Sequence, residues 1–273
     1  AFSLGWRENF LHVDFTPQRP LCKLYKSPDS GVKSMDMPRL VTLEEYRTLE
    51  RPSINWLIPG LLPKPGFVLL IGSPKAGKSS LALQIALAVA QGKIFLNKQV
   101  RNASVLYIQQ DESELSWRVG KLDVLKTHGV SLAGPVHMVH PEDERRGLDI
   151  LCSPDNIYLS MLIRESNAEL VVIDVLRELF CGDENESGTM KAVFDRIAAA
   201  TEGKAALLLH HIHKLDPRFP TPRPVDAARG SSYISGKVDA VWLLHDSTLR
   251  IQSRFGPDMT VTARRQPSGL FAF

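Results

Sequence analysis

The residues with the clearest chemical pattern are Gly72 to Ser79, which read GSPKAGKS and fit G-x-x-x-x-G-K-[S/T]. The two glycines allow the backbone to direct successive N–H groups toward a polyphosphate. The Lys78 ammonium would reach the β- and γ-phosphates, and the Ser79 hydroxyl would ligate Mg²⁺. The pattern predicts a site for ATP and Mg²⁺, with nucleotide contacts from Gly72, Ser73, Pro74, Lys75, Ala76, Gly77, Lys78, Ser79 and Ser80.

The surroundings of this stretch support the interpretation. The apolar run FVLLI (67–71) predicts a buried parallel strand before it, and SLALQIALAVAQG predicts a buried helix after it that ends at Gly92. The helix N-terminus would add its positive dipole end to the phosphate site. The alternative is a glycine-containing turn that only joins a strand to a helix.

A carboxylate is needed beside Ser79 to hold Mg²⁺. LVVID places Asp174 at the end of an apolar strand, where α/β sheets bind ligands. We therefore expect Ser79 and Asp174 to form the metal site. The alternative for Asp174 is a strand-end residue that caps a turn.

A further acid should activate the attacking water. Asp111 and Glu112 directly follow the predicted strand SVLYIQ (104–109), so either could serve as the general base. The pattern does not decide between them. The alternative is that Asp111 or Ser113 caps a helix that starts at residue 114.

Three histidines lie close together in LLHHIHKLDP: His210, His211 and His213. Such a cluster could bind a metal ion. However, neighbouring side chains on an extended strand point to opposite faces, which opposes convergence of three ligands. A buried core histidine is a further alternative.

The remaining composition is that of a globular protein with a net charge of +3. Residues 214–265 hold nine Lys or Arg and five Asp, so this part is basic and could meet phosphates, although a solvated surface also explains it. The three cysteines are far apart, which indicates a reducing compartment. No apolar run is long enough to span a bilayer and no secretory signal is visible, so we expect no membrane association.

The pattern of elements predicts an α/β fold. Strands alternate with helices from residue 66, and three strands follow in succession near 238–244, 248–254 and 259–264. This order predicts a mostly parallel twisted sheet flanked by helices, with antiparallel strands at the C-terminal edge. A helix over 113–129 should bury Leu115, Val119, Leu122 and Leu125. We expect residues 1–50 to form an arm with one short helix at 42–50, and residues 51–273 to form the main domain.

The motifs together resemble a known group of proteins. The phosphate loop, VLYIQQDE, VVIDVLRELFCGDENESG, LLLHHIHK and ARGSSYISGKVDAVW occur in this order. They are similar to those of the RecA/DnaB superfamily of ATPases, most of all its plasmid RepA-type hexameric replicative helicases. The resemblance covers about residues 55–265 and is most specific from Val171 to Trp242.

The resemblance implies a RecA-like core, a homohexameric ring with active sites shared between neighbours, and single-stranded DNA in the central channel. Asp111 falls where the superfamily usually has a catalytic glutamate, which leaves Glu112 open as the base. Arg118 matches an arginine near the nucleotide base, and His211 matches the residue that senses the γ-phosphate. Arg250 and Arg254 match the region that supplies a positive charge to the neighbour's γ-phosphate.

Two segments are candidates for DNA contact. Residues 181–188 are acidic, so a subunit contact is at least as good an interpretation there. Residues 214–232 are basic and rich in proline, which suits backbone contact and base stacking with a single strand. A mobile loop without DNA contact is the alternative. The DNA-binding candidates are Lys214, Arg218, Phe219, Arg223 and Arg229.

The sequence thus favours an ATP-driven DNA helicase or translocase in a bacterial, plasmid or phage cytoplasm, with other replication proteins as further partners. The second hypothesis is a RecA-like DNA-binding or regulatory ATPase, a recombination or repair accessory without unwinding activity. A small-molecule kinase is a third hypothesis, but no helical segment supplies the arginines that its lid would need.

Overall fold

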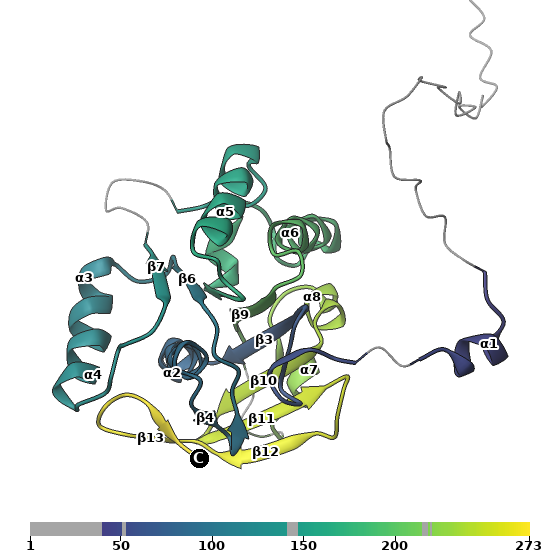
Figure 1. Ribbon diagram of the computed structural model, residues 1–273. Coiled ribbons are helices and arrows are strands. Elements are labelled where there is room, and N and C mark those ends of the chain that lie inside the picture. Colours follow the sequence, from purple (N-terminus) through teal and green to yellow (C-terminus); the bar gives the residue numbers. More distant parts are fainter. Residues whose placement is uncertain (1–39, 51–52, 141–146, 215–217, 219) are drawn as a thin grey trace, which may run out of the picture. The chain divides into compact units, whose positions relative to one another are not determined.

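The computed structural model describes residues 40–50, 53–140, 147–214, 218 and 220–273 (Figure 1). The chain divides into two units at Arg51 and Pro52, and each is described by itself. In the first unit, α1 (Leu43–Thr48) lies within the predicted helix at 42–50. Its capping box is complete, because Thr42 accepts a hydrogen bond from the Glu45 N–H and Glu45 accepts one from the Thr42 N–H.

The second unit is built on an eight-stranded sheet that confirms the predicted fold class. The strands run in the order β12 (Met259–Thr262), β11 (Thr248–Ser253), β10 (Ala240–His245), β3 (Gly66–Gly72), β9 (Ala205–His211), β8 (Leu170–Asp174), β6 (Val105–Gln109) and β7 (Val136–Val139). The strands from β10 to β7 are parallel to one another, and β11 and β12 add the antiparallel edge.

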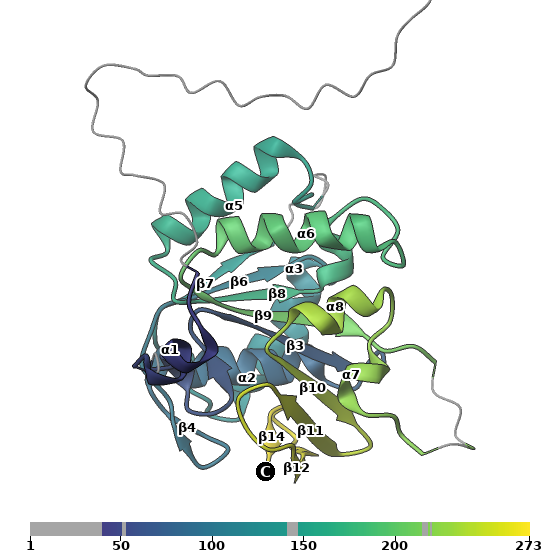
Figure 2. The same cartoon turned by 90° about the vertical axis from the view of Figure 1, so that its right-hand side faces the viewer.

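Helices cover both faces of this sheet (Figure 2). One face carries α2 (Lys78–Gln91) and the run of α3 (Glu114–Trp117), a π-helical turn (Arg118–Leu122) and α4 (Asp123–Thr127). The other face carries α5 (Ser153–Glu165), α6 (Ser187–Ala200) and α8 (Ser232–Lys237). Alternation along β3 serves both cores, because Val68 and Leu70 pack toward α2 while Leu69 and Ile71 pack toward the other face.

Short elements complete the unit. They are the strand pairs β1 (Trp56–Ile58) with β2 (Leu62–Pro63), β4 (Ile94–Phe95) with β5 (Lys98–Gln99) and β13 (Arg264–Arg265) with β14 (Phe271–Ala272), the 3₁₀ helix Leu176–Leu179, and α7 (Pro224–Ala227). Among the residues that the structure describes, no helix combines the length and the apolar character needed to cross a membrane.

The buried face predicted for the helix at 113–129 is partly wrong. Leu115 and Val119 are 73% and 56% exposed, whereas Trp117 is fully buried and Leu125 is 2% exposed. The cause is the π turn, which sets Trp117 rather than Arg118 above Leu122. A count of 3.6 residues per turn therefore selects Leu115, which precedes the π turn, and Val119, which lies within it, although both are exposed.

The parallel strands bring the ends of four segments to one edge of the sheet. Gly72 at the end of β3 is in register with His211 of β9, and Asp174 at the end of β8 is in register with Gln109 of β6. This edge of the sheet therefore brings together the phosphate loop, the acids after β6, Asp174 and His211.

Candidate nucleotide site

The phosphate loop lies between β3 and α2, as predicted. Gly77 precedes the helix at φ +99°, a backbone conformation that glycine adopts readily. No side chain caps the start of α2, so the first N–H groups of this 14-residue helix are available to an anion. The Lys78 ammonium donates to the carbonyls of Gly72 and Ser73, both at 3.1 Å, and burial lowers its pKa.

A cavity of about 510 Å³ opens over this loop. Its volume lies in the range of small-molecule sites, and its walls combine cations, acids and hydroxyl groups. The residues that line it are Pro74, Lys75, Gly77, Lys78, Ser79, Ser80, Asp111, Glu112, Lys121, Asp174, Val175, His211 and Arg265. These side chains fit a triphosphate with a divalent cation, because Ser79 and Asp174 offer hard oxygen ligands and Lys78 offers positive charge.

Asp174 is 2% exposed at the floor of the cavity. The Tyr107 hydroxyl donates to its Oδ2 at 2.8 Å, and the Gln109 amide lies 3.4 Å from the same oxygen. Burial raises the pKa of Asp174 to about 6, although hydrogen bonds from the Tyr107 and Ser79 hydroxyls oppose the rise. A buried carboxylate that needs a positive partner is suited to a Mg²⁺ shell.

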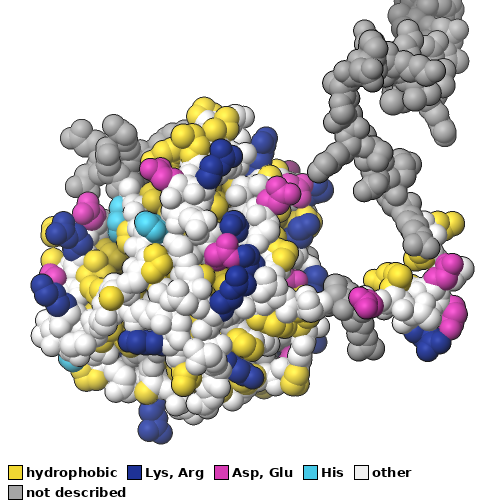
Figure 3. Space-filling model, in the orientation of Figure 1, with side chains coloured by type: hydrophobic (Ala, Val, Ile, Leu, Met, Phe, Trp, Pro, Cys, Tyr) yellow, Lys and Arg dark blue, Asp and Glu magenta, His cyan; other side chains and the backbone are white. Residues whose placement is uncertain are grey.

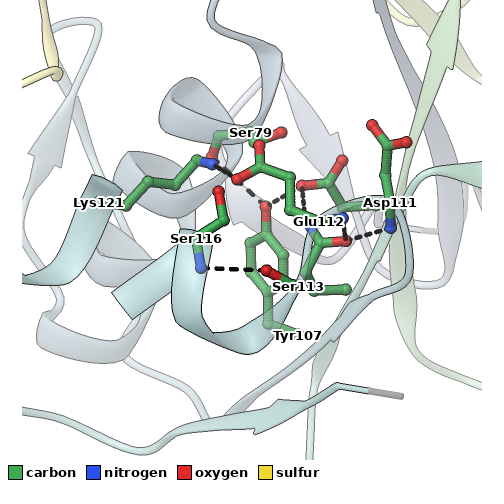
Figure 4. Close-up of polar contacts among 9 residues, drawn as sticks. Ser79, Tyr107, Asp111, Glu112, Ser113, Ser116 and Lys121 are labelled. Atoms are coloured by element: carbon green, nitrogen blue, oxygen red, sulfur yellow. Dashed lines mark hydrogen bonds and ion pairs between the residues drawn. The ribbon is translucent and has the colours of Figure 1, made fainter. Parts of the chain in front are cut away.

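The two acids after β6 lie in different surroundings (Figure 4). The Gln109 side chain accepts hydrogen bonds from the backbone N–H groups of both Asp111 and Glu112, which fixes this turn. The Glu112 carboxylate accepts a hydrogen bond from the Lys121 ammonium, forming an ion pair. The Asp111 carboxylate is exposed toward the cavity and accepts no hydrogen bond from the described residues.

Ser113 caps the following helix, as one alternative expected. Its hydroxyl accepts a hydrogen bond from the Ser116 N–H at 3.2 Å. Asp111 is therefore not used as a cap. Both acids remain available for other roles.

The histidines at the end of β9 face different groups. His211 lines the cavity and is half-buried, whereas His210 is fully buried and its Nε2 lies 3.0 Å from the Arg229 carbonyl. Burial lowers the pKa of His210 to about 4, so its ring is neutral near pH 7. His213 is exposed, and no three His, Cys, Asp or Glu side chains group as metal ligands within the described part of the chain.

Sequence reasoning missed Tyr107, Gln109, Lys121 and Arg265. The first two carried a usable signal, because they are polar residues two positions apart inside an otherwise apolar strand and so share one face. Lys121 lies in the π turn, 4.4 Å from the Trp117 ring centroid, and nothing local marks it. Arg265 reaches the cavity from a distant part of the chain.

Three arginines from the sequence analysis lie outside the wall of this cavity. Arg118 is exposed and pairs with Glu114 at 3.4 Å. Arg250 donates to the carbonyls of Thr221 and Pro222 at 3.2 and 3.0 Å, and Arg254 donates to the Gly236 carbonyl. Their roles toward a nucleotide base or a neighbouring subunit stay predictions.

The DNA-binding candidates differ in their surroundings. Lys214 and Arg218 are exposed, and Arg223 pairs with Asp226 at 2.7 Å. Phe219 lies outside the described residues. Lys and Arg side chains are interspersed with other types on the face drawn in Figure 3.

The Arg229 side chain pairs with a buried acid of the domain. Its Nε lies 2.6 Å from Oε1 of Glu184, a side chain that is only 4% exposed. Its backbone N–H donates to the His211 carbonyl, and His213 N–H donates to the Ala227 carbonyl, so the segment 214–226 is closed at its base. The acidic segment 181–188 thus contributes a buried internal anion, Glu184, rather than only surface charge.

The fold and the site define the class of this protein. It is a P-loop ATPase of the RecA/DnaB superfamily, with the phosphate loop on a parallel sheet, an acid at the end of β8 and the strand order described above. Comparison with known proteins gives the family. The AAA domain family AAA_25 matches residues 33–217, and the chain belongs to that family.

Individual relatives agree with this class. The DNA repair protein RadA of Bacillus subtilis (strain 168) is 26% identical over 215 residues, which cover 76% of this chain and 38% of RadA. The chain thus spans less than half the length of that relative.

Two solved structures share the fold. The KaiC-like protein PH0186 of Pyrococcus horikoshii OT3 has a TM-score of 0.52 at 15% identity, covering 79% of this chain and 93% of its own. A second solved structure, itself an ATPase domain, has a TM-score of 0.56 at 14% identity, covering 76% of this chain and 84% of its own.

Proposed function

We propose that the chain is an ATP-driven DNA helicase or translocase that acts as a homohexameric ring on single-stranded DNA. The observation that carries the proposal is the convergence in one cavity of Lys78, Ser79, Asp111, Asp174 and His211, which come from the ends of four neighbouring strands. Such a set contains the groups that one subunit would supply to nucleotide hydrolysis. We also propose that residues 1–50 form an arm and residues 51–273 form the ATPase domain.

Each side chain has a defined part in this chemistry. Ser79 and Asp174 would hold Mg²⁺, which neutralises charge that develops on the phosphates. Lys78 would exchange its bonds to the Gly72 and Ser73 carbonyls for phosphate oxygens. Asp111 would accept the proton of the attacking water, because its carboxylate faces the cavity while Glu112 is paired with Lys121.

The path from the nucleotide to the DNA runs through His211. Its side chain lines the cavity, and its carbonyl accepts the N–H of Arg229 at the base of the basic segment. Arg250 holds the same segment through the Thr221 and Pro222 carbonyls. A change at the γ-phosphate could therefore move a segment that carries Lys214 and Arg218 toward or away from a strand of DNA.

The test is ATP turnover with and without single-stranded DNA. We expect DNA to raise turnover several-fold, about 3-fold or more, because DNA bound to the basic segment would act on His211 through the Arg229 N–H. If DNA neither binds nor changes turnover, the motor proposal fails. Replication proteins are the further partners that this proposal includes.

A second function is favoured by one comparison. The relative that shares 26% identity over 76% of the chain is named a DNA repair protein. A DNA-dependent ATPase that assists recombination or repair without unwinding would use the same residues. A forked duplex with a 5′ or 3′ tail separates the two functions, because only the helicase releases the paired strand.

A further inference from the structure

The C-terminal hairpin of β13 and β14 is fixed against the phosphate-loop helix. The Gln84 side chain of α2 accepts a hydrogen bond from the Phe271 N–H at 2.8 Å and donates one to the Phe271 carbonyl at 2.9 Å. The Phe271 ring is buried against Gly77, where an added Cβ atom would lie 2.8 Å from the ring. The hairpin thus cannot shift without disturbing the loop that it covers.

This hairpin carries Arg265 to the rim of the nucleotide cavity. Arg265 is in register with Phe271 across the hairpin. It lines the cavity that contains Lys78 and Ser79, and also an adjoining cavity of about 300 Å³ beside Ser73 and Lys75. It lines a small third cavity next to Ser80 and Lys121 as well. Arg265 therefore shares cavity walls with residues of the phosphate loop from Ser73 to Ser80.

The Arg265 guanidinium has no hydrogen bond or ion pair with the described residues. This distinguishes it from Arg223, Arg229, Arg250 and Arg254, whose guanidinium groups all have acceptors within the chain. The neighbouring Lys121 ammonium is already paired with Glu112. Among the described residues, the cations of this cavity that are not paired with a carboxylate are Lys75, Lys78 and Arg265.

We propose that Arg265 binds the phosphates of the nucleotide held by the phosphate loop of its own chain. The inference rests on the proposed ATP site. A guanidinium is planar, always charged and able to donate two parallel hydrogen bonds to phosphate oxygens. Its backbone is already positioned by Gln84 and Phe271, so little ordering is needed when the nucleotide binds.

Arg264 provides a matched control. It is the preceding residue of the same strand, it is also exposed, and it lines none of the three cavities. Successive side chains of a strand point to opposite faces, so Arg264 should point away from the phosphate loop. Removal of either arginine changes the net charge equally.

The experiment measures the Kd for mant-ATP with Mg²⁺ in the full chain carrying Arg265→Ala, Arg264→Ala or Lys78→Ala. We expect Arg265→Ala to raise Kd about 10-fold, the effect of one charge-assisted hydrogen bond, and Arg264→Ala to change it by less than about 2-fold. Arg265→Lys should recover part of the loss. Equal Kd values for Arg265→Ala and wild type would overturn the role of Arg265 while leaving the site in place.

Two further results have separate meanings. If Lys78→Ala and wild type bind mant-ATP equally, both the proposed nucleotide site and the role of Arg265 are overturned. If Arg265→Ala lowers ATP turnover and mixing it with Lys78→Ala subunits restores activity, Arg265 acts on a neighbour's nucleotide, and the assignment to its own chain is wrong. No recovery at any mixing ratio supports the assignment.

Discussion

At the scale of single residues, the surroundings of the two acids after β6 decide which can act as a base. Glu112 is held by Lys121, and Lys121 in turn lies over the Trp117 ring. Asp111 has no such partner among the described residues and is exposed toward the cavity. The shorter acid is therefore the better placed proton acceptor, although the superfamily resemblance suggests a glutamate.

We expect Asp111→Asn to lower the rate of ATP hydrolysis about 100-fold or more, the usual contribution of a general base, without loss of mant-ATP binding. Glu112→Gln should lower the rate by less than about 5-fold, because it removes only an ion pair with Lys121. Steady-state turnover measured on both variants checks this. The opposite order of the two effects would identify Glu112 as the base.

Asp174 makes nucleotide binding depend on pH. Because burial raises its pKa to about 6, its ionised form is lost as pH falls through that value. Mg²⁺ binds the carboxylate and competes with the proton, so binding should be full above pH 6 and weaken below it, by about 10-fold for each further unit. The measurement is the Kd for mant-ATP with Mg²⁺ from pH 5 to 8. Asp174→Asn should lack this step, and identical profiles for the two proteins would contradict the assignment.

At this scale, the sequence alone could predict the position of side chains that lie next to one another in the chain or directly at the end of a strand. The phosphate loop is one continuous stretch, and Asp174 directly ends its strand, so both could be placed at one sheet edge. Lys121 and Arg265 enter the same cavity from a π turn and from a distant hairpin. Their positions depend on tertiary packing, which no local pattern contains.

At the scale of elements, the strands were predictable because parallel strands buried on both faces are short continuous apolar runs. The helix α5 was not predicted, since several of its apolar residues, including Ile157 and Met161, are exposed rather than arranged as one buried stripe. The segment 214–232 was taken as a loop, but it contains α7 and the start of α8. Four-residue and six-residue helices give too few turns for periodicity to be recognised.

The connection between β9 and the basic segment includes an ion pair between a buried acid and a partly exposed arginine. Glu184 is 4% exposed and pairs with Arg229, and His210 is neutral and cannot replace that positive charge. We expect Glu184→Ala to lower the free energy of unfolding by about 1–2 kcal/mol, because the Arg229 side chain is 56% exposed and stays solvated when its partner is removed. The midpoint of thermal unfolding should fall by about 2–8 °C.

Glu178→Ala is the matched control, because Glu178 is an exposed acid on the neighbouring 3₁₀ helix. It should change the free energy of unfolding by less than about 0.5 kcal/mol. Thermal unfolding followed by circular dichroism compares the two variants. If both midpoints match that of wild type, Glu184 does not stabilise this part of the domain.

At the scale of the whole molecule, the proposed ring would place an arginine of one subunit at the nucleotide site of its neighbour. Arg250 and Arg254 both have acceptors within their own chain, and neither lines the nucleotide cavity of that chain. Arg250 is half-buried at the base of the basic segment. Either arginine would reach a nucleotide only across an interface between two subunits.

We expect mixtures of Arg250→Ala and Lys78→Ala subunits to recover part of the ATPase activity that each variant lacks. In a mixed ring, some interfaces would combine an intact phosphate loop with an intact arginine. Turnover measured across mixing ratios, with native mass spectra to count subunits, checks this. Activity that stays at the level of the separate variants would argue against Arg250 as a residue that acts in trans.

The phosphate loop holds the proposed nucleotide, so Lys78→Ala tests the site most directly. Steady-state ATP turnover should fall at least about 100-fold relative to wild type, with and without single-stranded DNA, because the charged contact to the γ-phosphate is lost. Near-normal turnover in Lys78→Ala would contradict the assignment of the nucleotide site and the mechanism built on it.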